Sequence, residues 1–231
     1  MVAIVDYGVG NLFSLKSSFG AIGVEAVVTA DKAVLRAADS VLLPGVGAFE
    51  DAARKLRSSG LDIVIKQLAT EGKPLLGICL GMQLLFETSY EYGCHEGLGL
   101  LKGTVRPIRD VIPADYKIPH IGWNPLIFKQ DSPLFSHIHE GDCVYFVHSY
   151  YATDCEESVI ATAEYGAELT AAVAYKNVFG CQFHPEKSGP VGLNILKAFA
   201  EMKEGTICLY ILPLTFMEAK RYAFSKGIIT K

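Results

Sequence analysis

Short apolar segments alternate with amphipathic ones along the first eighty residues. The segments 2–7 (VAIVDY), 24–30 (VEAVVTA), 40–45 (SVLLPG) and 74–79 (PLLGIC) predict strands, because they are short, apolar and rich in branched side chains. Segments with helical periodicity lie between them at about 12–22, 47–59 and 61–71, and a further helix is expected from Leu80. Strands that alternate with helices predict a parallel sheet covered by helices on both faces.

Beyond Thr104 strand-like sequence predominates. The segments TVRPI, CVYFVHSYYAT, VIATAEY and TAAVAYKNVFGCQFH follow one another almost without helical sequence, and a helix closes the series at 189–202. We therefore expect a three-layer α/β fold, with a mostly parallel central sheet, helices on both faces and an added antiparallel or mixed strand region. This domain is placed at 1–205, and 206–231, where Pro213 interrupts an apolar run, is treated as an atypical C-terminal tail of unknown role.

Composition narrows the class of protein. The formal charge of -4 and the lack of a Lys/Arg-rich run argue against a nucleic-acid partner. No apolar run approaches the ~18 residues of a membrane span, and MVAIVDYG lacks the features of a secretory signal, so a cytoplasmic protein without membrane association is expected. The cysteines are irregularly spaced and no His/Cys/Asp/Glu set has ligand spacing, which favours reduced thiols and predicts neither a metal nor a cofactor.

Cys79 stands between two glycines where a predicted strand meets a predicted helix. GICLG (77–81) has the form of a nucleophile elbow, in which the glycines avoid collisions with the adjoining strand and helix. The start of a helix favours the thiolate, and the amide of Leu80 becomes a candidate oxyanion donor. A free cysteine is also a common packing residue, so Cys79 needs a base before it can be interpreted as a nucleophile.

His184 and Glu186, in QFHPEKS, supply a base and a group to orient it. His184 ends a strand-like run, and residues i and i+2 of an extended segment point to one side, so Glu186 can lie beside the imidazole. Pro185 is expected to keep this segment extended. Each residue alone is more simply a surface or strand-end residue, but a cysteine elbow with a later His-x-Glu predicts a Cys79, His184, Glu186 triad.

A glycine-rich loop after the third predicted strand is a candidate for the second oxyanion donor. In LPGVGAF, Gly45 and Gly47 flank Val46, and the Val46–Gly47 peptide has the freedom to turn its N–H toward a reacting carbonyl. Phosphate binding is a weaker interpretation, because Phe13 and Glu50 stand where a dinucleotide fingerprint has its third glycine.

Two further polar groups are expected near the thiol. Gln83 lies one helical turn after Cys79 on the same helix face, where its amide either contacts a substrate or reaches solvent. The segment 145–151 (YFVHSYY) concentrates aromatic and hydroxyl groups that either line a pocket or pack on the sheet, and its spacing does not decide between the two. From the residues alone, the chain is predicted to be a cysteine hydrolase of small amides.

The motifs together resemble a known family. VDYGVGNL, LPGVGAF, GICLGMQLLFE, PHIGWN, YFVHSYY and QFHPEKS occur in the order found in triad-type (class I) glutamine amidotransferases, and the resemblance covers about residues 2–203. The triad motifs mark the whole family. DYGVGNL, PGVGAF and HIGWN resemble its branch of glutaminase subunits of imidazole glycerol phosphate synthase, from histidine biosynthesis, whereas the tail after about Gly205 departs from the usual family length.

The resemblance implies an enzyme that hydrolyses L-glutamine. Cys79 would attack the side-chain amide, His184 would move protons and Glu186 would orient His184, so that glutamate and ammonia form through a thioester. Leu80 and the Val46–Gly47 peptide resemble the oxyanion hole, the peptide after a flip that the partner promotes. The positions that resemble the glutamine-holding contacts are Gly45, Gln83, His148, Ser149 and Tyr150.

The resemblance also implies a heterodimer with a (βα)8-barrel cyclase subunit. The cyclase would receive ammonia through an enclosed passage and make imidazole glycerol phosphate and AICAR. The positions that match the partner-facing surface are Asn11, His120, Trp123, Asn124 and Tyr145. Two alternatives remain: another triad-type amidotransferase or γ-glutamyl hydrolase that delivers no ammonia to this cyclase, and a non-catalytic binding scaffold, which the presence of all three triad residues disfavours.

Overall fold

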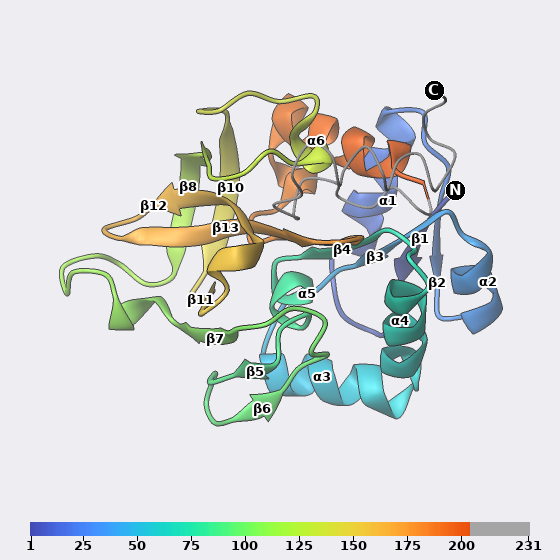
Figure 1. Cartoon of the computed structure of the whole chain (residues 1–231), viewed down its shortest axis with the longest axis horizontal. Helices are drawn as coiled ribbons and strands as arrows, with labels where there is room; N and C mark the ends of the chain where they lie inside the picture. Colours follow the sequence, from blue (N-terminus) through green and yellow to red (C-terminus); the bar gives the residue numbers. More distant parts are fainter. Residues whose placement is uncertain (204–231) are drawn as a thin grey trace, which may run out of the picture.

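An 8-stranded sheet forms the centre of residues 1–203, the part of the chain that the structure, a computed structural model, describes (Figure 1). Its order is β2 (Ala26–Thr29), β1 (Val2–Val5), β3 (Ser40–Leu43), β4 (Leu75–Ile78), β14 (Val178–Cys181), β13 (Glu168–Tyr175), β12 (Val159–Glu164) and β9 (Ile127–Phe128). The pairs from β2 to β14 are parallel, and those from β14 to β9 are antiparallel. The expected tail, 206–231, lies outside the described residues.

Helices cover both faces of this sheet. They are α1 (Leu12–Ala21), α2 (Lys32–Ala37), α3 (Phe49–Ser58), α4 (Leu61–Thr70) and α6 (Gly189–Glu201). α1 and α6 pack on one face, and α2, α3 and α4 pack on the other (Figure 1). In β1, Val2 and Ile4 belong to the apolar cluster between the sheet and helices α1 and α6. Ala3 and Val5 belong to the cluster on the other face, because successive strand residues point to opposite faces. The expected three-layer α/β fold is confirmed.

Two smaller sheets flank the antiparallel end. One pairs β8 (His120–Pro125) with β10 (Cys143–His148), and the other has the order β11 (Tyr150–Thr153), β7 (Thr104–Pro107), β5 (Thr88–Ser89), β6 (His95–Glu96). Short 3-10 helices are η1 (Ile108–Asp110), η2 (Pro133–Phe135), η3 (Glu156–Ser158) and η4 (Pro185–Lys187). The segment expected as one strand at 143–153 is therefore two strands in different sheets, and the chain passes from one to the other at Ser149.

The strand-like segment at 170–184 is a hairpin rather than a single strand. It turns at Lys176, where φ is +55°, and β14 returns to pair with both β13 and β4. In the parallel pair Cys181 lies opposite Ile78, and the N–H of Cys79 donates to the carbonyl of Cys181 at 2.7 Å. His184 and Cys79 therefore leave the ends of adjacent parallel strands, which brings distant sequence segments together.

The helix expected from Leu80 is much shorter than its sequence suggests. α5 spans only Leu80–Gln83, and the residues that follow, Leu84 to Phe86, are buried on all sides. The segment 98–101 folds back onto them, and its N–H groups donate to the carbonyls of Leu84, Leu85 and Phe86. Those carbonyls would otherwise continue the helix, so tertiary hydrogen bonds end it.

Several elements were not expected from the sequence, among them α2 and β8. α2 has a clear start signal, because the carboxylate of Asp31 accepts from the N–H groups of Ala33 and Val34. β8 is hard to recognise from the sequence, because Gly122 lies in its interior and Pro119 and Pro125 lie at its ends, and both residue types argue against a strand.

Gly81→Ala is expected to destabilise the protein by about 3 kcal/mol, near the upper end of the usual cost of overpacking a core. A Cβ at Gly81 would lie 2.0 Å from the carbonyl oxygen of Leu43, which is fixed within the central sheet. Gly20→Ala is a matched control, because Gly20 lies in α1 with nothing within 4 Å of its Cβ position, and should stabilise by about 0.5–1 kcal/mol. Urea unfolding measures both values, and equal effects at the two positions would contradict the packing argument.

Candidate active site

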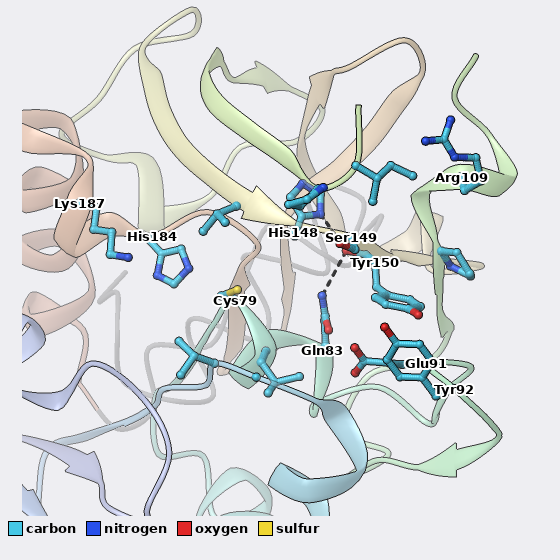
Figure 2. A pocket seen from close by; sticks show the side chains of 17 residues that line it. Cys79, Gln83, Glu91, Tyr92, Arg109, His148, Ser149, Tyr150, His184 and Lys187 are labelled. Atoms are coloured by element: carbon cyan, nitrogen blue, oxygen red, sulfur yellow. Dashed lines mark hydrogen bonds between the residues drawn. The ribbon is translucent and has the colours of Figure 1, made fainter. Parts of the chain in front are cut away.

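A cavity of about 570 Å³ opens where β4 and β14 end (Figure 2). Its size is typical of a pocket for a small molecule. Residues from seven separate parts of the chain line it, among them Val46, Gly47, Cys79, Leu80, Gln83, Glu91, Tyr92, Arg109, His148, Ser149, Tyr150, His184 and Lys187. Nine of the residues that the sequence placed near the site therefore meet at one cavity: Val46, Gly47, Cys79, Leu80, Gln83, His148, Ser149, Tyr150 and His184.

Cys79 lies on a strained bend, as the elbow pattern predicts. Its φ of 53° and ψ of -113° are rare for a residue with a side chain, and it precedes α5 directly. The flanking glycines are required by close approach: a Cβ at Gly77 would lie 2.7 Å from the backbone of Gly81 and Met82. The bend directs the thiol of Cys79 into the cavity (Figure 2).

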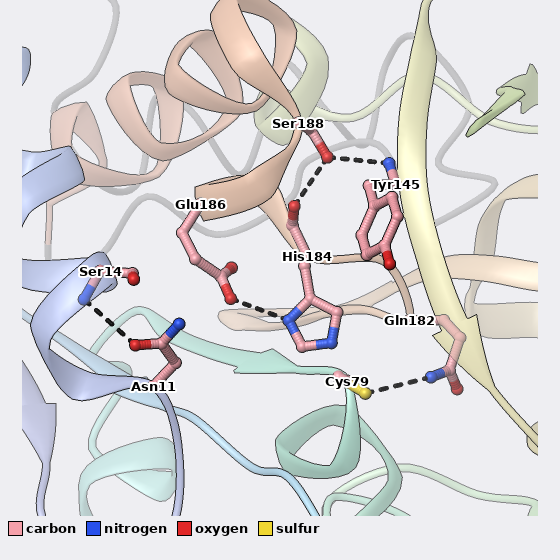
Figure 3. Close-up of polar contacts among 8 residues, drawn as sticks. All are labelled: Asn11, Ser14, Cys79, Tyr145, Gln182, His184, Glu186 and Ser188. Atoms are coloured by element: carbon pink, nitrogen blue, oxygen red, sulfur yellow. Dashed lines mark hydrogen bonds and ion pairs between the residues drawn. The ribbon is translucent and has the colours of Figure 1, made fainter. Parts of the chain in front are cut away.

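His184 and Glu186 form a buried hydrogen-bonded pair (Figure 3). Nδ1 of His184 lies 2.8 Å from Oε1 of Glu186, and their side chains are only 3% and 2% exposed. The expected extended geometry is wrong, because Pro185 opens the 3-10 turn η4 and Glu186 reaches the imidazole from that turn. Proline's fixed φ suits the first position of a turn as well as an extended segment, which explains the error.

Hydrogen bonds to β10 hold the turn that carries this pair. Ser188 Oγ donates to the carbonyl of His184 at 2.7 Å and accepts from the N–H of Tyr145 at 3.0 Å (Figure 3). The N–H of His184 also donates to the carbonyl of Tyr145 at 2.9 Å. These bonds to β10 therefore fix the position of the His184 backbone, and with it the imidazole beside the thiol.

Opposing effects set the pKa of His184. Burial lowers this pKa, whereas hydrogen bonding with Cys79 and Glu186 and the negative charges of both raise it, and the net result is a pKa of about 9. An imidazole with a raised pKa is protonated at neutral pH. A positively charged imidazole is the form that supports a thiolate, the nucleophilic form of cysteine.

The two candidate oxyanion donors differ in how firmly they are held. Leu80 is buried in the elbow, and a Cβ at Gly45 would lie 2.5 Å from the N–H nitrogen of Gly81, so the start of the loop is clamped against the elbow. Gly47 has a φ of +92° and nothing within 4 Å of its Cβ position, and Val46 is 44% exposed. Gly45 itself is not among the cavity-lining residues.

The amide nitrogen of Gln83 is engaged by the protein. Gln83 Nε2 donates to the carbonyl of Tyr150 at 3.2 Å and to Oε1 of Gln182 at 2.9 Å. Among the described residues, no hydrogen bond to its Oε1 is found. Gln83 thus faces the cavity with an acceptor rather than a donor, and the sequence alternatives of substrate contact or solvent exposure resolve toward a buried cavity wall.

Besides Lys187, three polar cavity residues were not anticipated from the sequence. Glu91 and Tyr92 lie in the loop between β5 and β6, and Arg109 lies in η1. One Glu91 oxygen accepts from the N–H of Phe49 at 2.5 Å, and burial raises the pKa of Glu91. No spacing rule connects these residues to the triad, because short irregular loops carry them to the cavity.

The five partner-facing candidates do not share one environment. Trp123 is 54% exposed and packs edge-to-face on Tyr145 of the neighbouring strand, whereas Asn11 caps α1. His120 is buried, with Nδ1 3.0 Å from Nε2 of His148 and Nε2 2.8 Å from Oδ1 of Asn124. His120 therefore connects Asn124 to the cavity rather than forming part of the surface.

The His120–His148 pair makes stability depend on pH. Burial lowers the pKa of His148 to about 3, against its hydrogen bond to the Tyr150 carbonyl, and the charges of His120 and His184 lower it further. Because the folded pKa lies below the ordinary value near 6.5, the unfolded chain binds one more proton between these pH values. The stabilisation is complete above about pH 6.5 and is lost as the pH falls toward 3.

The free energy of unfolding of His148→Gln should therefore fall less steeply on acidification than that of the wild type. One proton corresponds to about 1.4 kcal/mol per pH unit between roughly pH 6 and pH 4. His184, whose pKa is raised, is protonated in both states over this range and leaves the slope unchanged. Urea unfolding at several pH values gives the slopes, and parallel curves for the two proteins would contradict this assignment.

Residues 1–203 contain neither a metal-holding cluster of side chains nor a helix that could span a membrane. No group of three or more His, Cys, Asp or Glu side chains there is arranged to hold a metal ion. None of the helices described in this part of the chain is long and apolar enough to cross a membrane.

Sequence comparison identifies related proteins over nearly the whole described chain. A family model described as glutamine amidotransferase class-I matches residues 3–202. The chain is 50% identical over 203 residues to imidazole glycerol phosphate synthase subunit HisH of Caldanaerobacter subterraneus subsp. tengcongensis, covering 87% of this chain and 98% of the relative. It is 48% identical over 206 residues to the subunit of the same name from Geobacter sulfurreducens, covering 87% and 99%.

Solved structures share the fold at lower identity. A crystal structure of a glutamine amidotransferase has a TM-score of 0.67 at 20% identity and covers 86% of this chain and 99% of that one. PurLQS from Thermotoga maritima has a TM-score of 0.65 at 22% identity, with 86% and 96% covered. At these identities the likeness establishes the fold alone.

Proposed function

Since this chain belongs to the class-I glutamine amidotransferase family, we propose that it is the glutaminase subunit of imidazole glycerol phosphate synthase and acts in histidine biosynthesis in the cytoplasm. The observation that carries the proposal is the meeting of Cys79 and His184 at one cavity, with Glu186 hydrogen-bonded to His184. Relatives of that name are matched over almost their full length, which supports this branch of the family over other amidotransferases and over γ-glutamyl hydrolases.

Cys79 is the proposed nucleophile. Its thiolate attacks the side-chain amide carbon of L-glutamine, and imidazolium His184 gives its proton to the departing nitrogen, so that ammonia leaves and a γ-glutamyl thioester remains. Neutral His184 then takes a proton from water, which attacks the thioester and releases glutamate and Cys79. Glu186 holds the imidazole through Nδ1 and keeps Nε2 directed at the thiol.

The oxyanion that forms on the amide oxygen needs two donors. The N–H of Leu80 follows the nucleophile directly and is fixed by the elbow. The Val46–Gly47 peptide is the second donor in this proposal, since it lines the same cavity. Its freedom at Gly47 suits a donor that is aligned only when the partner is bound.

The cavity offers charge and acceptors suited to glutamine. Gln83 presents Oε1, which can accept from the amide N–H groups of the substrate, and Ser149 and Tyr150 line the same wall. Glu91 presents a carboxylate to the cavity, and we assign it to the α-ammonium group of glutamine (Figure 2). Glutaramic acid, which is glutamine without that ammonium group, should therefore be a much poorer substrate.

The partner in this proposal is the cyclase subunit, which turns the ammonia into imidazole glycerol phosphate and AICAR. The exposed residues Ile121 and Trp123 on β8 give it an apolar surface beside Tyr145. Apolar residues of this size on an exposed strand are typical of protein interfaces.

One assay tests the proposal. Purified chain is mixed with a cyclase subunit and its phosphoribulosyl-formimino substrate, and glutamate and imidazole glycerol phosphate are measured together. Formation of both products in equal amounts is expected. Glutamate release without imidazole glycerol phosphate would favour a γ-glutamyl hydrolase, and no release at all would favour a non-catalytic scaffold.

A further inference from the structure

Gln182 contacts the nucleophile but plays no part in the chemistry described so far. It is fully buried on the segment between β14 and His184, and its Nε2 lies 3.7 Å from Sγ of Cys79. Figure 3 shows Gln182 and His184 reaching the sulfur from different directions. Burying an amide is costly unless its polar atoms are hydrogen-bonded, so its partners define what it can do.

The orientation of the Gln182 amide follows from its neighbours. The carbonyl of Tyr150 can only accept, so Gln83 must turn Nε2 toward it, at 3.2 Å. The second proton on that nitrogen then points to Gln182, whose facing atom at 2.9 Å must be Oε1. The remaining Gln182 group, Nε2 with its protons, is left facing the sulfur of Cys79.

The hydrogen bonds from Tyr150 through Gln83 to Gln182 therefore present an N–H donor to the sulfur of Cys79. The strongest hydrogen bonds to such a donor come from a negatively charged acceptor. We propose that Gln182 is a catalytic residue that donates a hydrogen bond to the Cys79 thiolate and stabilises its charged form, while Gln83 is a positioning residue that fixes the direction of the Gln182 amide. The inference rests on the proposed function, in which Cys79 is the nucleophile. It assigns to Gln83 a task inside the protein in addition to its cavity-facing oxygen.

Two variants of Gln182 remove this donor. Gln182→Met keeps the length of the side chain without an N–H group, and Gln182→Asn keeps an amide that is one methylene too short to reach the sulfur. Alkylation of Cys79 by iodoacetamide is followed by peptide mass spectrometry, because Cys94 and Cys143 are also exposed to reagent. At pH 7 both variants should alkylate Cys79 at least about tenfold more slowly than the wild type, the scale of a hydrogen bond to a charged group.

The pH profile separates this role from a structural one. A cysteine with an ordinary pKa near 8.5 is almost fully ionised above about pH 10, so the rates of Cys79 alkylation in variants and wild type should converge there. Gln130→Leu is the matched control, because it likewise removes a glutamine amide that donates hydrogen bonds within the protein. The Gln130 amide donates to two backbone carbonyls and lies away from the cavity, so this variant should alkylate Cys79 at the wild-type rate. Wild-type rates at pH 7 in both folded Gln182 variants, or a loss that persists at high pH, would overturn the proposal.

Alkylation requires neither glutamine nor the cyclase, so this test is independent of the proposed function. A wild-type chain that does not release glutamate, with variants that show the pH-dependent loss, would refute the glutaminase assignment and keep the role of Gln182. A chain that hydrolyses glutamine, with variants that alkylate normally, would keep the glutaminase assignment and refute the role of Gln182.

Discussion

Cys79→Ser is expected to abolish glutamine hydrolysis, with turnover in the presence of the cyclase falling by about 10⁴-fold or more, the scale seen when the nucleophile of a triad is removed. The serine hydroxyl occupies nearly the same space, but it is not ionised by an imidazole whose pKa is near 9, and the thiolate is lost. Serine also accepts the same strained backbone as cysteine, so folding and partner binding should be retained. Glutamate release, thermal unfolding and co-purification with the cyclase measure the three properties.

Cys94→Ser is the matched control for that variant. Cys94 is an exposed thiol in the loop before β6 and is not among the residues that line the main cavity, so its substitution should leave turnover unchanged. Substantial glutamate release by a clean preparation of Cys79→Ser would refute the nucleophile assignment.

The free chain should hydrolyse glutamine about 10²–10³ times more slowly than the chain bound to a liganded cyclase, the contribution of one oxyanion donor. The Val46–Gly47 loop is clamped at Gly45, which lies against the elbow, and is unrestrained at Gly47. Glycine at position 47 gives the Val46–Gly47 peptide conformational freedom, and the partner is expected to select the orientation in which its N–H faces the oxyanion.

Steady-state glutamate release measures this difference at saturating glutamine, with the cyclase alone and the Cys79→Ser complex as blanks. The effect should appear in kcat more than in KM, because the donor acts on the transition state rather than on bound substrate. Equal rates with and without the partner would count against a partner-aligned donor.

Local chemistry in the sequence was enough to predict the elbow and the three-layer fold. Gly77 and Gly81 flank Cys79 because backbone atoms approach within collision distance on both sides, and that requirement is visible as a spacing. The alternation of apolar and amphipathic segments likewise follows from burial on both faces of the sheet.

Features set by distant contacts could not be predicted. α5 ends early because the segment 98–101 donates to the carbonyls of the residues that follow α5, and Glu186 reaches His184 from a turn rather than from an extended strand. Gln182 lies two residues before the histidine and resembles any other strand residue until Gln83 and Tyr150 are placed beside it. Glu91 depends on an irregular loop, for which no periodic pattern exists.

The pairing of β14 with β4 has a consequence for synthesis of the chain on the ribosome. The elbow thiol is translated about a hundred residues before the strand that positions its base, and the N–H of Cys79 has its carbonyl partner on that later strand. A nascent chain that ends before β14 thus carries an unpaired cysteine without acid–base assistance. Catalytic competence is acquired only after β14 and His184 have been translated, so products truncated before them should not hydrolyse glutamine.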